Sequence, residues 1–207
     1  MRCIPRLIAF ASLALLCAAP AYATQHLFET VTVSGGVPTG PGMDGPSESP
    51  ANASPGTGYG TALYDDLAHT LKLDATFTGL TGTVTQSHIH TPTATPFVST
   101  VGVVVIPGTL PGFPPGVTSG IYSQTLDLTQ ASSYAPTYVS LHGGVGGAEI
   151  ALISQFNQGR AYWNIHSSTF GGGEIRGFFV SVPEPATCAL IAMYAAFFGC
   201  FTRTRRK

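Results

Sequence analysis

The sequence predicts an all-β domain, a Greek-key-like β-sandwich or barrel with one short helix, between two apolar ends. The chain has 25 glycines and 16 prolines, and only 9% of its 207 residues are charged. This balance favours turns and short strands over long solvated helices. Apolar and polar residues also alternate through much of the central part. We expect one β domain over residues 24–182, an N-terminal signal peptide over 1–23 and a C-terminal transmembrane helix within 183–207.

The first 23 residues have the organisation of a secretory signal peptide. Arg2 and Arg6 precede an apolar run, residues 7–19, and Ala21 and Ala23 are the small residues that a signal peptidase requires. One alternative is an uncleaved anchor, for which the run is short. Another is a lipoprotein acylated at Cys17, but Leu16 before it is bulky where that signal needs a small residue. Cleavage after Ala23 is therefore expected.

The C-terminal end combines three features in order. Pro183-Glu184-Pro185 is followed by an apolar stretch, residues 186–201, and by a basic end, residues 203–207. Sixteen helical residues span about 24 Å, near the lower limit for crossing a bilayer. The basic end should remain cytoplasmic, so the body of the protein should face outward.

These three features resemble the PEP-CTERM sorting signal of Gram-negative bacteria. The resemblance implies recognition by an exosortase, which is a membrane transpeptidase. It also implies an inner-membrane-anchored precursor that is later delivered to the cell surface or the extracellular matrix. An ordinary C-terminal anchor with a proline-rich entry is the alternative.

Charge and cysteine content limit what the body can do. Between Thr24 and Val182 there are three basic and nine acidic residues, a formal charge of −6. Such a surface repels phosphate backbones, so we expect no nucleic-acid partner. The cysteines all lie in the two ends, which leaves the body without a disulfide.

Nine segments of the body have the period-two pattern or the apolar content of strands. Asp65-Asp66 marks the turn of a hairpin, and two proline- and glycine-rich segments, 35–60 and 107–120, are expected to be loops. The expected strands are 27–33, 62–64, 71–77, 83–90, 98–106, 121–128, 138–141, 161–166 and 174–181. The last two are joined by a turn at Gly171-Gly172-Gly173.

One segment, residues 148–157, has helical periodicity. Ile150, Ile153 and Phe156 recur at helical spacing, and Gly159 stands where a C-terminal cap belongs. The sequence therefore predicts one short helix that packs through these three side chains.

Three motifs occur in a fixed order: Ser87-His88-Ile89-His90, the segment 159–166 that ends Tyr-Trp-Asn-Ile-His, and Gly-Glu-Ile-Arg-Gly at 173–177. Together they resemble the CHRD domain, a module named from chordin that occurs in many secreted bacterial proteins. The resemblance covers roughly residues 28–180. It departs from the family at Thr91, where glycine is usual, and through the segment 108–147.

The histidines are the candidate ligands. His88 and His90 point to one face of their strand, while Ile89 enters the core. Ile165 likewise points inward, so His166 lies on the outer face of its strand. If the two strands are close, three imidazoles can bind copper or zinc. A His-x-His strand also begins the copper site of Cu/Zn superoxide dismutase, an analogy at the level of the fold. The alternative is that these histidines only tie a strand to a loop by hydrogen bonds.

The last hairpin is expected to have a structural or binding role through Asn164, Glu174 and Arg176. Glu174 and Arg176 are two residues apart and on one face, which favours a structural ion pair or a backbone clamp over catalysis. Three further histidines have no partner in the sequence and are expected on the surface: His26, His69 and His142.

The body has no nucleophile elbow, zinc-protease helix, phosphate loop or cysteine. We therefore expect no enzyme, but a noncatalytic surface or matrix protein that binds a protein, a polysaccharide or a metal ion. The competing hypothesis is an extracellular copper- or zinc-binding protein or metalloenzyme that uses His88, His90 and His166. Signal peptidase, an exosortase-type transpeptidase and the membrane are the expected processing partners.

Overall fold

Ten antiparallel strands form the framework of the computed structural model, which describes residues 24–183. The leader and the segment from Glu184 onward, including most of the Pro-Glu-Pro motif and the predicted transmembrane helix, lie outside the described residues. Within residues 24–183, no helix combines the length and apolar character that a bilayer crossing requires. The strands are β1 (Gln25–Ser34), β2 (Val37–Pro41), β3 (Met43–Asp44), β4 (Thr57–Asp65), β5 (Thr70–Thr78), β6 (Val84–His90), β7 (Val103–Val105), β8 (Gly120–Asp127), β9 (Tyr162–Ser167) and β10 (Ile175–Ser181).

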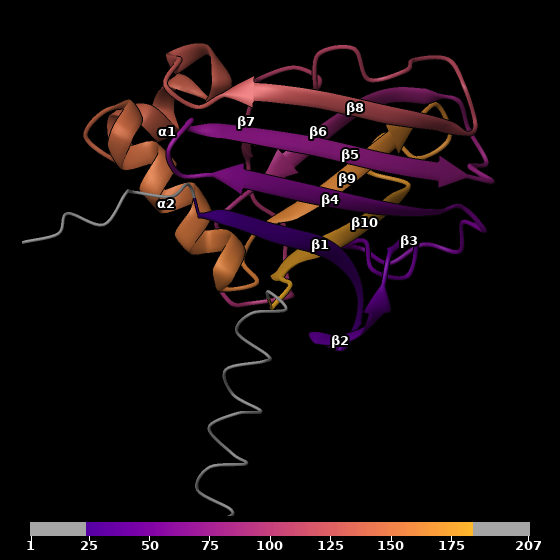
Figure 1. Ribbon diagram of the computed structural model, residues 1–207. Coiled ribbons are helices and arrows are strands. Elements are labelled where there is room, and N and C mark those ends of the chain that lie inside the picture. The colour runs from indigo at the N-terminus through magenta and orange to yellow at the C-terminus, as the bar shows by residue number, and fades with distance from the viewer. Residues whose placement is uncertain (1–23, 184–207) are drawn as a thin grey trace, which may run out of the picture.

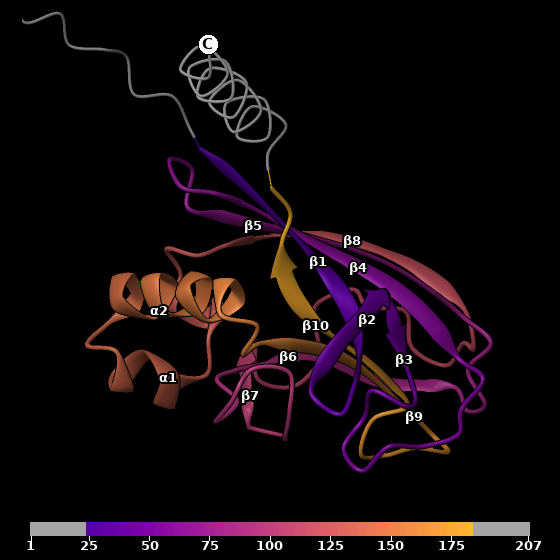
Figure 2. The same cartoon turned by 90° about the horizontal axis from the view of Figure 1, so that it is seen from below.

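The strands form one continuous sheet that folds into two layers. Strands β8, β5, β4 and β1 are the first layer, and β10, β9, β6 and β7 are the second. The layers join at β1, which pairs with β4 through residues 25–29 and with β10 through residues 28–31. The first layer lies in front of the second in Figure 1, and Figure 2 shows the two from below. The predicted all-β class is confirmed.

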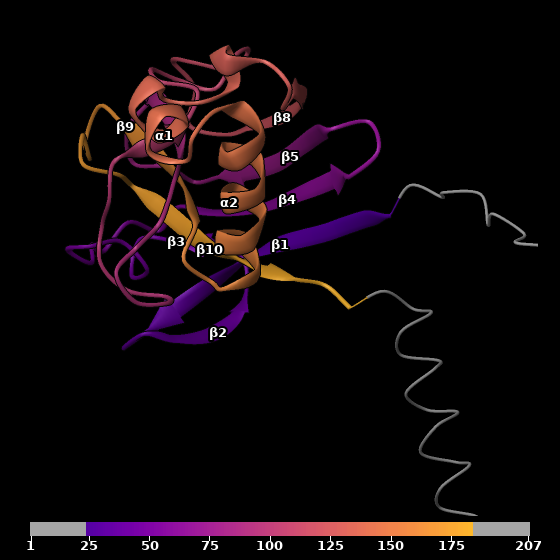
Figure 3. The same ribbon diagram turned by 90° about the vertical axis from the view of Figure 1, so that its left-hand side faces the viewer.

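Two α-helices, not one, close one end of the sandwich. They are α1 (Pro136–Leu141) and α2 (Val145–Asn157), and α2 runs across that end in Figure 3. Phe156 of α2 stacks on Phe179 of β10, with ring centroids 4.4 Å apart. Gly159 has the left-handed backbone (φ +64°) expected of a C-terminal cap.

Several element predictions were wrong. The segment 138–141 is helical because Pro136 at the first position starts a helix and outweighs the local strand preference. In α2, Ile150 is 75% exposed, because the buried face is centred on Leu152 and Phe156. The expected loop 35–60 contains β2 and β3 and the start of β4. The expected strand 98–106 shortens to the three residues of β7.

The β4–β5 hairpin forms as predicted, and its turn contacts α2. His69 in this turn is exposed, as predicted, and its Nδ1 lies 2.8 Å from Oε1 of the buried Glu149. Tyr64 also donates a hydrogen bond to the same oxygen, at 2.7 Å. The carboxylate on α2 therefore joins the helix to the hairpin, a contact between residues 80 positions apart that no local pattern indicates.

Trp163 lies at the centre of the core between the layers. Its ring contacts those of Tyr122 and Phe179, with centroids 5.9 and 6.2 Å away, and Nε1 donates to Ser87 Oγ at 2.8 Å. Gly60 of β4 leaves room for this ring: a Cβ atom there would lie 2.8 Å from Trp163 Cε3. The tryptophan thus requires a residue without a side chain in the opposite layer.

We predict that Gly60→Ala destabilises the protein by about 1–3 kcal/mol, because the added methyl group forces the tryptophan or the strand to move. Urea unfolding monitored by tryptophan fluorescence measures the change. Gly40→Ala is the matched control, since a Cβ atom at that strand position meets no heavy atom within 4 Å. Equal unfolding midpoints for the parent and Gly60→Ala would refute the tight contact.

Candidate functional site

Polar side chains form a row across the second layer, on the face opposite the core. His88 of β6 pairs in register with Asn164 of β9, which pairs with Arg176 of β10, which pairs with Asp44 of β3. Side chains directly opposite one another in such a ladder are close enough to interact. The register therefore brings together residues from three separate parts of the sequence.

This polar face is covered by other segments, although the histidines on it were predicted to be on the outer face of their strands. Phe97 and Val101, from the segment 91–102, pack with Tyr162 and Phe178 in a second apolar cluster. The segment 45–56 covers the neighbouring part of the face: Ser47 and Ser54 hydrogen-bond to residues of this face. The imidazoles are consequently buried, with His88, His90 and His166 only 6%, 8% and 9% exposed. Ile89 and Ile165 lie in the core as predicted.

The three predicted histidines converge. Nδ1 of His88 lies 3.0 Å from Nε2 of His166. One nitrogen from each of the three rings, including His90, lies within 4.8 Å of the other two. The structure therefore brings the candidate ligands to one point, with two of them contributed by β6 and one by β9.

The other nitrogens of these rings are held by the backbone. His90 Nδ1 donates to the Val101 carbonyl oxygen at 2.7 Å, and His166 Nδ1 donates to that of Gly171 at 2.8 Å. A backbone hydrogen bond with Gly108 similarly engages His88. In a neutral imidazole, only one nitrogen carries a proton. For His90 and His166 these bonds fix the proton on Nδ1 and leave Nε2 unprotonated toward the cluster, the arrangement found in metal-binding histidines.

Burial keeps these rings neutral. It lowers the pKa of His88 and of His166, and the nearby His166 ring lowers that of His88 further. Burial also lowers the pKa of His90 to about 4, despite the bond to Val101. Neutral imidazole is the form that binds a metal, so the cluster has the right protonation state at neutral pH.

Arg176 and Glu48 lie beside the histidines. The guanidinium of Arg176 donates to the backbone oxygens of Ser47 and Ser99 and lies over the Tyr162 ring, 4.8 Å from its centroid. Its Nε is 3.8 Å from Glu48 Oε2. Burial raises the pKa of Glu48 to about 7, although the charge of Arg176 opposes the shift. Arg176 thus holds the segment 45–56 against the sheet.

Glu174 holds different segments, so Glu174 and Arg176 do not pair with one another. The Glu174 carboxylate accepts hydrogen bonds from Ser54 Oγ at 2.6 Å, from the Thr81 backbone nitrogen and from that of Gly82. Asn52 Nδ2 donates to the Glu174 carbonyl oxygen at 3.0 Å. Of the two structural roles expected for Glu174, the geometry matches the backbone clamp.

Glu48 was not among the predicted site residues, because the segment around it has almost no apolar periodicity and was expected to be a loop. One signal was present: Asp44 and Glu48 are the only charged residues between positions 35 and 60. An isolated acidic side chain in an otherwise uncharged segment is a candidate partner for one of the few basic residues of the body.

Comparison with known proteins gives one match. The family model of the CHRD domain matches residues 42–179, which includes all three histidines, Asn164, Glu174 and Arg176. The searches of curated proteins and of solved structures give no match.

The Glu174 clamp predicts an acid-dependent contribution to stability. Burial alone would raise the pKa of Glu174, but hydrogen bonds from Ser167, Ser54 and two backbone amides lower it below the usual value. A carboxyl group whose pKa is depressed by folding stabilises above its unfolded pKa and loses that contribution as pH falls through the folded value.

We therefore expect Glu174→Gln to be less stable than the parent at pH 7, with a difference that shrinks below about pH 4. Urea unfolding at pH 7, 5 and 3.5 measures it. Asp66→Asn, at an exposed carboxylate in the hairpin turn, is the control for acid effects elsewhere. A difference between Glu174→Gln and the parent that is independent of pH contradicts the clamp.

Proposed function

The chain belongs to the CHRD domain family, and on that premise we propose that it is an exported, noncatalytic surface or matrix protein. We also propose that its domain binds copper(II) or zinc(II) through His88, His90 and His166. The observation that carries the metal proposal is the convergence of three buried imidazoles, of which His90 and His166 have their second nitrogens bound to backbone carbonyl oxygens.

The chemistry of the cluster supports this choice of ions. Imidazole nitrogens suit zinc and copper, and three protein ligands hold either ion with at least one further coordination position. The surrounding burial weakens competition from water, and the neutral state of the rings removes the need to displace protons at pH 7.

A binding role is favoured over a metalloenzyme. A substrate would have to reach the ion, yet the imidazoles are less than a tenth exposed, and His90 is bonded to Val101 in the segment 91–102. The groups around the cluster, Arg176 and Glu48, are engaged in holding those segments. The arrangement therefore favours retention of an ion over turnover of a substrate.

The boundaries of the domain support the export proposal. The first strand begins at Gln25, two residues after the predicted signal-peptidase site, and the last strand ends at Ser181, two residues before Pro183. The folded part thus fits between the two proposed processing sites. We propose that signal peptidase removes residues 1–23 and that an exosortase reads Pro183-Glu184-Pro185 in an inner-membrane-anchored precursor. Delivery to the surface would place the domain near extracellular polysaccharide or protein partners.

We predict that zinc(II) or copper(II) raises the melting temperature of the purified protein. Saturation at about 100 times the dissociation constant corresponds to about 2.7 kcal/mol of added stability. In His88→Ala this gain should be largely lost, because one of three ligands is removed. Differential scanning calorimetry with and without metal measures the effect.

His26→Ala is the control, because His26 is an exposed residue of β1 in the first layer and should leave the metal response unchanged. A chelator should reverse the gain of the parent. If metal does not change the melting of the parent, the histidines are structural and the metal proposal fails.

For sorting, we predict that Glu184→Ala leaves an uncleaved precursor in the membrane, because the transpeptidase no longer recognises the Pro-Glu-Pro motif. Immunoblotting of membrane and surface fractions from cells that express the tagged protein measures the processing. Asp66→Ala, a change in the body of the domain, is the control. Identical processing of the parent and Glu184→Ala rules out recognition of this motif.

A further inference from the structure

Resting on the proposed metal site, we infer that Asn164 is its fourth ligand through Oδ1 and that Glu48 and Arg176 hold the carboxamide in position. Asn164 is placed for this role by the sheet. It lies directly opposite His88 in the β6–β9 ladder, and His166 is two residues further along the same face of β9. The carboxamide therefore lies among the three imidazoles.

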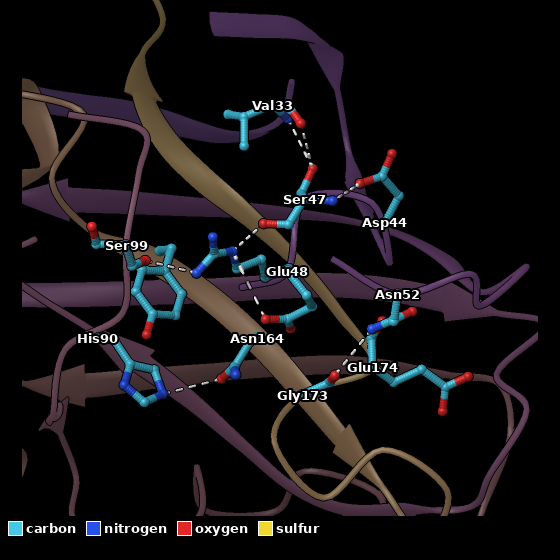
Figure 4. Close-up of polar contacts among 12 residues, drawn as sticks. Val33, Asp44, Ser47, Glu48, Asn52, His90, Ser99, Asn164, Gly173 and Glu174 are labelled. Atoms are coloured by element: carbon cyan, nitrogen blue, oxygen red, sulfur yellow. Dashed lines mark hydrogen bonds and ion pairs between the residues drawn. The ribbon is translucent and has the colours of Figure 1, made fainter. Parts of the chain in front are cut away.

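The contact between Asn164 and His90 carries the argument. Asn164 Oδ1 lies 3.2 Å from His90 Nε2, and Figure 4 shows the two groups facing each other. His90 Nδ1 already donates to Val101, so Nε2 of the neutral ring is an acceptor, as is Oδ1. A second proton on the ring would bury another cation in a layer that already contains Arg176. A metal ion bound by both atoms removes the conflict.

The spacings fit two edges of one coordination polyhedron. Ligand atoms about 2.0–2.1 Å from a tetrahedral ion lie about 3.3 Å from one another. The pair Asn164 Oδ1 and His90 Nε2 is 3.2 Å apart, and the pair His88 Nδ1 and His166 Nε2 is 3.0 Å apart. Each pair is thus at the separation of two ligands of the same ion.

The orientation of the carboxamide is set by the neighbouring charge pair. Asn164 Nδ2 and Glu48 Oε1 both lie next to Gly173, and Asn164 favours the charged form of Glu48 against the effect of burial. Arg176 Nε is 3.8 Å from the other oxygen, Glu48 Oε2. Rotation of the carboxamide by half a turn would place Oδ1 against that carboxylate. Gly173, with φ +127°, leaves space for this contact, since a Cβ atom there would collide with Glu48 Oε1. Glu48 is therefore a positioning residue for the ligand.

This ligand set favours the divalent ions zinc(II) and copper(II) over copper(I). Three imidazole nitrogens and an amide oxygen are neutral donors of borderline and hard character, which suit zinc(II) and copper(II). Copper(I) prefers thiolate and thioether sulfur, which this set does not supply. The site should therefore select the divalent ions.

The test compares Asn164→Leu, which lacks the ligand oxygen at similar size, with Asn164→Asp, which retains one. Zinc(II) affinity of the full chain is measured by competition with a chromogenic chelator, and copper(II) coordination by electron paramagnetic resonance. We expect Asn164→Leu to bind zinc at least tenfold more weakly than the parent and to change the copper spectrum. We expect Asn164→Asp to retain the affinity of the parent.

Two further variants keep Asn164 itself. Glu48→Ala removes the acceptor that orients the carboxamide and should weaken zinc binding and alter the copper spectrum, whereas Glu48→Gln retains an acceptor oxygen and should resemble the parent. Circular dichroism melting of the metal-free proteins checks that each variant folds. If Asn164→Leu does not fold, the two Glu48 variants decide the question.

The outcomes separate the two proposals. A parent that binds neither zinc nor copper overturns the proposed metal site. A parent that binds, with Asn164→Leu showing the same affinity and the same copper spectrum, overturns the assignment of Asn164 alone. When Asn164→Leu is unfolded, equal affinities and spectra of Glu48→Ala and the parent overturn it.

Discussion

Every side chain of β9 is buried, although only alternate ones face the core, and much of the structure follows from this constraint. Trp163 and Ile165 fill the space between the two layers. Tyr162, Asn164 and His166 on the other face require a second cover and hydrogen-bonding partners, because unpaired buried polar groups are costly. The segments 45–56 and 91–102 supply the cover, and the backbone carbonyls of Val101 and Gly171 supply partners. The polar site is thus part of the packing of a strand that is buried on both faces.

The sequence predicted which way side chains point, but not what covers them. Period-two alternation placed Ile89 and Ile165 in the core and put the histidines on the opposite face, and the motif spacing identified all three. Their burial depends on segments whose own sequence has no periodicity. The helix at 136–141 was missed for a related reason: its only signal is the proline at its first position, which also suits a turn.

The contacts that hold the segment 45–56 against the sheet join residues far apart in the sequence, so no local sequence pattern predicts them. Arg176 reaches the Ser47 carbonyl across 129 positions, and Glu174 reaches Ser54 across 120. Arg176 and Glu174 each make several hydrogen bonds to uncharged groups. Charge-assisted hydrogen bonds therefore contribute to the clamp beside the contact of Arg176 with Glu48. With three basic residues in the body, the partners of each charged side chain have a large effect on how the loops are placed.

The position of the site relative to the ends of the domain bears on the proposed sorting. Thr24 and Val182 are close together, since Phe28 pairs with Ser181 and the Val182 nitrogen donates to the Leu27 carbonyl. The chain therefore enters and leaves at one end of the sandwich. Arg176 is five residues before Ser181 on the extended β10, about 16 Å along the strand. The clamp and the loop that holds His166 accordingly lie toward the other end. A tail that holds the domain at a membrane would therefore leave the end with the clamp and the His166 loop free to face the surroundings.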